Sequence, residues 1–189
     1  MAPRLMLVAH APTEATRRGA FPRDEGIEPG VEPVALRAAQ VLLGPELRCR
    51  QTADALGWAG DVDPGFADLD AGRWRGRALA EVMGSDPDDV AEWLADPTAC
   101  PHGGEALADL LIRVGAALDS RDWPDGRSIV LTSPLVVRAA LVHLLRAPAS
   151  MIFAIDVGPL VAVTVSGHGG RWVLQAMQPV RAWSRTQRS

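Results

Sequence analysis

Lysine, asparagine and tyrosine are all missing from this 189-residue chain, and its 19 basic residues are therefore all arginine. Such a bias is typical of a GC-rich bacterial genome, so the abundance of arginine is not by itself evidence for anion binding. Cysteine is scarce too, because Cys49 and Cys100 are the only two and have no CxxC spacing. This excludes a disulfide framework, and both cysteines are expected to be free thiols.

The chain also lacks a basic excess and a long apolar run. A formal net charge of -4 argues against broad binding of nucleic acid, which needs a basic face that displaces counterions. No stretch approaches the roughly 20 apolar residues of a membrane span, and the first 15 residues lack the pattern of a signal peptide. The sequence therefore predicts a cytoplasmic protein that binds neither nucleic acid nor membrane.

Metal-binding patterns are missing as well. The four histidines show no paired spacing, and the acidic residues do not cluster, so we expect no metal site and no cofactor. The remaining partner class is a small-molecule substrate, and the sequence leaves a homodimer open.

Length and hydrophobic content are those of one globular domain, expected over residues 1–180 and followed by a tail at 181–189. Apolar runs and periodicity predict strands at residues 5–9, 41–44, 128–132, 160–166 and 171–177, and helices at 34–40, 46–56, 78–83, 88–94, 105–119 and 134–145. A long loop is expected at 11–33, mostly loop or an edge strand at 61–76, and a hairpin turn at 167–170. Strands that alternate with helices predict a three-layer α/β/α fold with a mostly parallel sheet and an antiparallel C-terminal hairpin.

Five short segments carry polar side chains, and three of the segments also contain glycine. They are LVAHAPT at 7–13, GPELRCRQTA at 44–53, DLDAGRWRG at 68–76, HGGEA at 102–106 and LTSPLVVRA at 131–139. Together they resemble the motifs of the histidine phosphatase superfamily, which has the phosphoglycerate mutase-like fold, over nearly the whole chain. Each segment alone is a weak signal, but their shared order makes the fold assignment specific.

The resemblance assigns catalytic roles to two residues. His10 stands where the family has a nucleophilic histidine at the end of the first strand, and Asp68 stands at the position of the proton donor. Arg48 matches the second family arginine, which holds phosphate oxygens. In such phosphatases the neutral imidazole attacks phosphorus and an acid protonates the leaving alcohol.

Two departures from the family pattern bear on that chemistry. Ala9 replaces the arginine that usually precedes the nucleophile, and Ser133 replaces the second histidine. Each loss of a stabilising donor is expected to lower the rate by on the order of 10²–10³. The pocket is therefore expected to suit a less charged ligand than a phosphate dianion, unless Arg17, Arg18 or Arg75 supplies the missing charge.

Further substrate-binding residues are expected from the matched motifs: Thr13, Ser133, Glu105 and His102, beside Arg48. Ser133 also has a structural explanation, because Ser followed by Pro134 is the usual start of a helix. His143 is interpreted as a packing residue within a helix, and His168 as a turn residue.

Three functions remain open at this point. One is an enzyme with a rewired pocket that acts on a small organic molecule through His10, by hydrolysis, dehydration or isomerisation. Another is a slow phosphomonoesterase that forms a phosphohistidine at the same residue. The third is a non-catalytic binding module, a pseudophosphatase.

Overall fold

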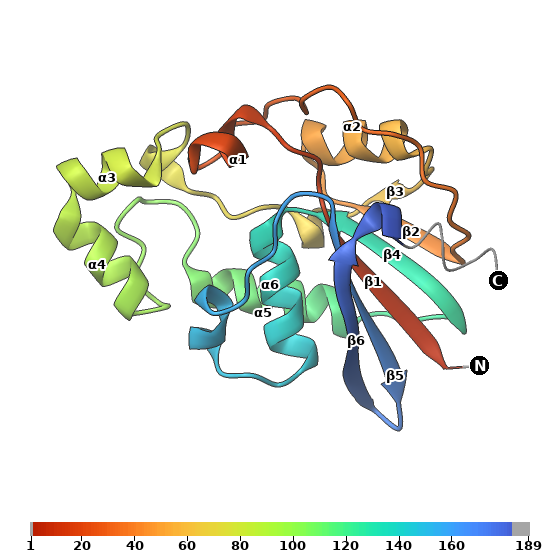
Figure 1. Ribbon diagram of the computed structural model, residues 1–189. Helices are drawn as coiled ribbons and strands as arrows, with labels where there is room; N and C mark the ends of the chain where they lie inside the picture. The colour runs from red at the N-terminus through yellow and green to blue at the C-terminus, as the bar shows by residue number, and fades with distance from the viewer. Residues whose placement is uncertain (1, 183–189) are drawn as a thin grey trace.

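A six-stranded mixed sheet forms the centre of the computed structural model, which describes residues 2–182 (Figure 1). Its strands are β1 (Pro3–Ala9), β2 (Gln40–Leu43), β3 (Asp61–Val62), β4 (Gly126–Thr132), β5 (Val161–His168) and β6 (Arg171–Pro179), in the order β3-β2-β4-β1-β5-β6. The first four strands in this order run parallel, whereas β5 is antiparallel to both β1 and β6. The predicted mostly parallel sheet with an antiparallel C-terminal hairpin is confirmed.

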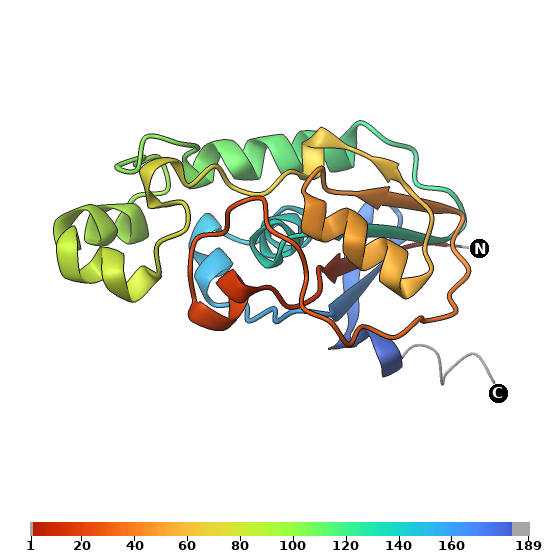
Figure 2. The ribbon, with the colours of Figure 1, turned by 90° about the horizontal axis from the view of Figure 1, so that it is seen from above.

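Helices cover both faces of the sheet. They are α1 (Glu14–Arg18), α2 (Leu47–Leu56), α3 (Leu79–Ser85), α4 (Pro87–Ala95), α5 (Leu107–Asp119) and α6 (Pro134–Leu144), with 3-10 helices η1 (Pro64–Phe66), η2 (Gly72–Trp74) and η3 (Ala149–Phe153). Helix α2 covers one face, and α5 and α6 cover the other (Figures 1 and 2). Helices α3 and α4 lie to one side, apart from the sheet (Figure 1).

The alternation of β1 explains why the molecule has three layers. Successive strand residues point to opposite faces, so Leu5 and Leu7 join the core beneath α5 and α6. Met6 and Val8 join a second core beneath α2. All four side chains are fully buried, as a central strand covered on both faces requires.

Local signals placed several element ends correctly. Gly57 ends α2 in the left-handed conformation, with φ of 76°. Ser133 caps α6, because its hydroxyl accepts a hydrogen bond from the Val136 amide, and Pro134 is the first helical residue. At the C-terminal hairpin the turn is shorter than predicted: only Gly169 and Gly170 lie between the strands, both with positive φ, as a two-residue turn requires.

The helix predicted at residues 34–40 is wrong, because residues 34–39 form no regular element and Gln40 begins β2. Its main chain bonds to neighbouring elements: the Val34 amide donates to the Leu56 carbonyl, and the Ala39 amide donates to Arg127. The Trp58 indole also donates to the Val34 carbonyl. These tertiary hydrogen bonds override a local helical pattern.

Other predictions need smaller corrections. The loop predicted at 11–33 contains the short helix α1, which begins at a capping box formed by Thr13 and Thr16. Cys49 and Cys100 are free, as predicted. Across residues 2–182 no helix has the length and apolar character of a membrane span. The predicted tail at 181–189 lies, from residue 183 onward, outside the described residues.

Candidate active site

His10 and Ser133 meet at one edge of the sheet because their strands are parallel neighbours. Ala9 pairs with Thr132 in the register of β1 and β4, so the next residue of each chain segment emerges at the same place. The His10 amide donates to the Thr132 carbonyl at 2.8 Å. Both His10 and Ser133 are buried. In open α/β sheets, ligands bind at the carboxyl ends of the strands.

The His10 ring is held in one orientation. Its Nδ1 lies 2.7 Å from the Ala11 carbonyl oxygen, which can only accept, so Nδ1 carries the proton. The lone pair is therefore on Nε2, which receives a hydrogen bond from Arg48 Nε at 3.2 Å. This neutral tautomer has the form that a general base or a nucleophile needs.

Burial lowers the pKa of His10 below its ordinary value of 6.5. The hydrogen bond to the Ala11 carbonyl opposes this shift, the charge of Arg48 reinforces it, and the carboxylates of Asp68 and Glu25 oppose it. Because desolvation disfavours the charged imidazolium, the ring is neutral at pH 7.

Arg48, on the first turn of α2, is 2% exposed and spends its donors on internal partners. Nε donates to His10, Nη1 donates to the Arg23 carbonyl at 3.0 Å, and Nη2 donates to Asp68 Oδ2 at 2.6 Å. An anionic ligand would have to compete with Asp68 for this guanidinium.

Asp68 connects Arg48 to Ser133. Its Oδ1 accepts a hydrogen bond from the Ser133 hydroxyl at 2.6 Å and another from the Leu69 amide at 2.9 Å. The Asp68 amide in turn donates to Glu46 Oε1 at 2.7 Å. His10, Arg48, Asp68 and Ser133 thus form one continuous hydrogen-bonded chain, and these four predicted residues come together.

A cavity of about 310 Å³ opens beside this chain. His10, Asp68 and Ser133 line it together with Arg138, and most of its remaining wall is apolar. A second cavity of about 600 Å³ includes Arg48 and also borders Asp68. Asp68 therefore separates an apolar compartment from a compartment of mixed charge.

Thr52 and Arg138 belong to this site but were not assigned to it from sequence. The Thr52 hydroxyl accepts from the Ala11 amide at 2.9 Å and donates to the Arg48 carbonyl at 2.6 Å. It therefore holds Ala11, whose carbonyl orients the His10 ring. Only their spacing in the sequence could have indicated these two residues. Thr52 follows Arg48 by one helical turn, and Arg138 follows Ser133 within α6.

Two predicted substrate-binding residues have structural partners instead. The Thr13 hydroxyl caps α1 by accepting from the Thr16 amide at 3.2 Å. Glu105 forms a two-pronged ion pair with Arg113, with distances of 2.8 and 2.7 Å. The structure does not place either side chain in the wall of the His10 cavity.

His102 lies in an aromatic cluster. Its ring centroid is 4.9 Å from that of Trp74 and 6.4 Å from that of Trp93. Its Nδ1 accepts from the Gly104 amide at 3.1 Å. Burial lowers the pKa of His102, although the charge of Asp70 opposes this shift. The ring therefore packs between two loops, and the structure does not place it in the wall of the His10 cavity.

The glycines of these two loops have a steric reason. Gly72 has a φ of 48°, and a Cβ there would lie 2.1 Å from the His102 carbonyl oxygen. A Cβ on Gly104 would lie 1.9 Å from the carbonyl oxygen of Asp70. Only glycine lets the loop that carries Asp68 approach the HGGEA segment this closely.

The three arginines considered as replacements for the missing pocket charge each pair with an acid other than Asp68. Arg17 Nε lies 3.3 Å from Glu28 Oε1, and Arg18 Nη2 lies 3.3 Å from Glu81 Oε1. Arg75 lies 2.8 Å from Asp70, at the second cavity.

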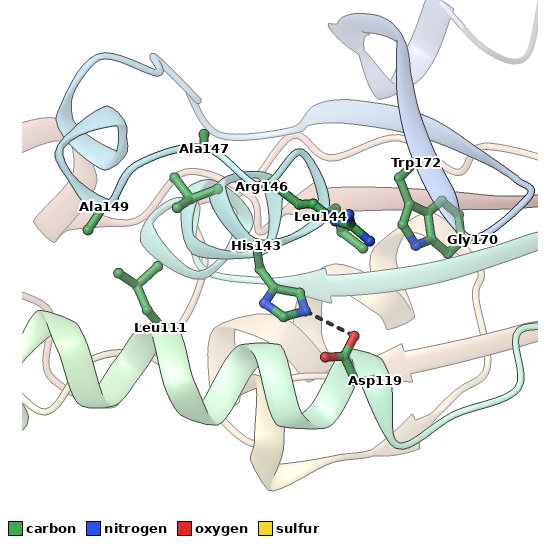
Figure 3. Close-up of a pocket in the computed structure, with 10 residues that line it drawn as sticks. Leu111, Asp119, His143, Leu144, Arg146, Ala147, Ala149, Gly170 and Trp172 are labelled. Atoms are coloured by element: carbon green, nitrogen blue, oxygen red, sulfur yellow. Dashed lines mark hydrogen bonds and ion pairs between the residues drawn. The ribbon is translucent and has the colours of Figure 1, made fainter.

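A separate cavity of about 500 Å³ is lined by residues of α5, α6 and the C-terminal hairpin. Figure 3 shows its lining residues, among which the His143 ring faces Asp119. His143 Nε2 lies 2.9 Å from Asp119 Oδ1. The interpretation of His143 as a packing residue is incomplete, because its ring links two helices through this contact. The lining residues that the structure describes include no serine, threonine or cysteine. His168 is the exposed last residue of β5 rather than part of the turn itself. Between residues 2 and 182 no three His, Cys, Asp or Glu side chains are grouped to hold a metal ion.

Known proteins share this architecture. Mycobacterial glucosyl-3-phosphoglycerate phosphatase Rv2419c superposes with a TM-score of 0.79 at 21% identity, covering 94% of this chain and all of that one. The alpha-ribazole phosphatase of Shigella flexneri superposes with a TM-score of 0.76 at 16% identity, covering 93% and 96%. At these identities the likeness shows the fold.

A curated relative, the bifunctional protein Rv2228c of Mycobacterium tuberculosis, is 33% identical over an alignment of 134 positions that covers 61% of this chain. The match spans only 36% of that relative's own length. Residues 33–179 match the family model described as histidine phosphatase superfamily (branch 1). This chain therefore belongs to the histidine phosphatase superfamily.

Proposed function

We propose that the protein is an enzyme that acts on a small organic molecule at His10, by hydrolysis, dehydration or isomerisation. The observation that carries the proposal is the hydrogen-bonded chain of His10, Arg48, Asp68 and Ser133 at the edge of a cavity. In this proposal His10 Nε2 is the base or nucleophile, and Asp68 exchanges a proton with the substrate.

The neutral state of His10 supports this role. Its Nε2 lone pair is available once Arg48 Nε moves to a substrate oxygen, and the Ala11 carbonyl keeps Nδ1 protonated throughout. Arg48 would then stabilise negative charge that develops on the substrate, and the Ser133 hydroxyl would donate a hydrogen bond. Arg48 and the Ser133 hydroxyl already donate hydrogen bonds to Asp68, so both belong to the network that includes His10.

The charge of the pocket favours a substrate other than a phosphate dianion. Asp68 occupies Arg48, and the position of a second family histidine holds a neutral serine. A dianion would meet the Asp68 carboxylate at short range, and the repulsion is strong where water is excluded. Slow or absent phosphatase activity follows from this arrangement.

A slow phosphomonoesterase is the second candidate. The protonated Nδ1 and unprotonated Nε2 of His10 suit in-line attack on phosphorus once Arg48 Nε releases Nε2. The structural neighbours named above are phosphatases, which supports this candidate at the level of reaction class.

Turnover measurements separate these candidates. Wild-type protein is incubated with p-nitrophenyl acetate, p-nitrophenyl phosphate and a panel of sugar and nucleotide phosphates, beside His10→Gln and a control, Arg146→Gln, whose residue lines the cavity of Figure 3. We expect turnover of an uncharged or singly charged substrate that falls by about 10²–10⁴ in His10→Gln and stays unchanged in the control. Phosphate release with an acid-labile phosphate on His10 would support the second candidate instead.

A non-catalytic binding module is the remaining alternative. It predicts that no compound of the panel is turned over and that His10→Gln leaves the biological activity intact. That pair of results would remove both enzyme proposals.

A further inference from the structure

Arg138 is the one arginine or lysine among the described residues that line the His10 cavity. Its side chain is 25% exposed, and its Nε is buried without a hydrogen-bond partner among residues 2–182. Buried polar atoms in native proteins nearly always have a partner, which for a cavity-lining guanidinium is commonly a ligand or water.

The acid beside Arg138 engages it weakly. Arg138 Nη2 lies 3.8 Å from Asp156 Oδ1, which is beyond hydrogen-bond distance, and the Asp156 side chain is fully exposed. Solvent screens such a pair strongly. Arg48 differs, because each of its three nitrogens donates to an internal partner. Of these two arginines, Arg138 is therefore the one whose N–H donors are available to a ligand.

Part of the wall of the same cavity is aromatic. Phe21, Trp93 and Phe153 line it, and Trp93 packs edge-on against both phenylalanines, with centroids 6.0 and 5.4 Å away. Leu94 and Phe153 are 48% and 41% exposed, an unusual amount for large apolar side chains beside a concave site. Such a wall gains stability when an apolar ligand covers it.

We propose that the cavity binds a singly charged organic acid, with its anionic head on Arg138 and an aromatic body against Phe21, Trp93 and Phe153. One guanidinium matches one negative charge, and the Asp68 carboxylate in the same wall disfavours a second. A volume of about 310 Å³ holds a body of one or two fused rings. This inference names the substrate class for the proposed function and rests on it only for turnover, because binding is measured separately.

The test uses three probes titrated by calorimetry into the full chain. Naphthalene-2-carboxylate has the head and the body, acetate has the head alone, and naphthalene-2-carboxamide has the body without the charge. We expect the carboxylate to bind at least about tenfold more tightly than either of the other two. Equal affinity of the amide and the carboxylate would overturn the role of the charge, and equal affinity of acetate and naphthoate would overturn the role of the wall.

Variants assign the effects to residues. Arg138→Gln is expected to weaken naphthoate by at least about tenfold and to leave the amide unchanged. Phe153→Ala is expected to weaken naphthoate and the amide alike, and Arg146→Gln serves as the matched arginine control. Arg138→Lys keeps the charge and is the second variant if glutamine unfolds the helix. Unchanged naphthoate affinity in a folded Arg138→Gln or in Phe153→Ala overturns the proposal.

Binding and turnover measured on the wild-type chain separate this inference from the proposed function. Naphthoate binding by the wild-type chain, with no turnover of any substrate, would remove the proposed function and leave this inference standing. Turnover that depends on His10, with no naphthoate binding, would remove this inference alone.

Discussion

Arg48 Nη2 and Asp68 Oδ2 lie 2.6 Å apart inside the site, with side chains that are only 2% and 13% exposed. The pair joins α2 to the loop before η2, two segments that are 20 residues apart in sequence. Because the same guanidinium also contacts His10, this ion pair sets both the charge of the pocket and the position of its base.

Removal of one partner of this pair is expected to destabilise the fold. Asp68→Ala leaves Arg48 buried without its counter-charge, which costs about 3–5 kcal/mol of unfolding free energy in comparable buried pairs. Urea denaturation of Asp68→Ala measures the loss. The matched control is Asp89→Ala, which breaks a solvent-exposed contact with Arg73 and should cost less than about 1 kcal/mol. Equal losses of unfolding free energy in the two variants would show that the buried Arg48–Asp68 pair contributes no more than the exposed pair.

Thr52 is expected to act as a positioning residue for His10. Thr52→Val keeps the shape of the side chain but leaves the Ala11 amide without its acceptor, which costs about 1–3 kcal/mol. Thr52→Ser keeps the hydroxyl and is the control. The NMR titration of His10 is the second readout, because a shift of its pKa in Thr52→Val, and none in Thr52→Ser, reports a moved ring. If both variants titrate like wild type, Thr52 is merely structural.

Stability is expected to depend on pH through His10. The pKa of His10 is lower in the folded chain than in the unfolded chain. Below about pH 6.5 the ring therefore takes up a proton in the unfolded chain and resists protonation in the folded chain. Stability is therefore complete above this pH and is lost as the pH falls toward the folded pKa, by up to about 1.4 kcal/mol per pH unit. Urea midpoints from pH 7.5 to 5 in wild type and His10→Gln measure the difference. Parallel profiles in the two proteins would contradict a lowered pKa.

The end of α6 offers a stability test away from the site. Arg146 has a φ of 53°, and its amide donates to the His143 carbonyl while the Ala147 amide donates to Val142, which together form a Schellman motif. Glycine is preferred at this left-handed position, so Arg146→Gly is expected to stabilise by about 0.5–1 kcal/mol. Ala147→Gly, at a position without positive φ, should destabilise. A loss of stability in Arg146→Gly would show that the arginine side chain makes compensating contacts.

Much of the sheet could be predicted from sequence, because its strands are short apolar runs bounded by proline and glycine. The same patterns brought His10 and Ser133 to one sheet edge, since each follows a buried strand. The segment at 34–40 failed because its structure depends on hydrogen bonds to Leu56 and Arg127, which local sequence does not encode.

The contacts within the site were harder to predict than its members. Arg48 and Asp68 were assigned from motifs, but their direct pairing depends on how a loop folds back on α2. Thr13 and Glu105 were assigned in the same way, and their side chains satisfy a helix cap and Arg113 instead. Arg138 lies in the matched segment at 131–139 but was assigned no role, because its place in the cavity wall depends on how α6 packs in the folded chain.

Vanadate binding tests the central claim most directly. The claim is that the Arg48 guanidinium is ion-paired with Asp68, so that the pocket binds a phosphoryl dianion weakly. Calorimetric titration of wild-type protein with vanadate is predicted to give a dissociation constant of about 1 mM or weaker. Micromolar binding that is abolished in Arg48→Gln would contradict the account.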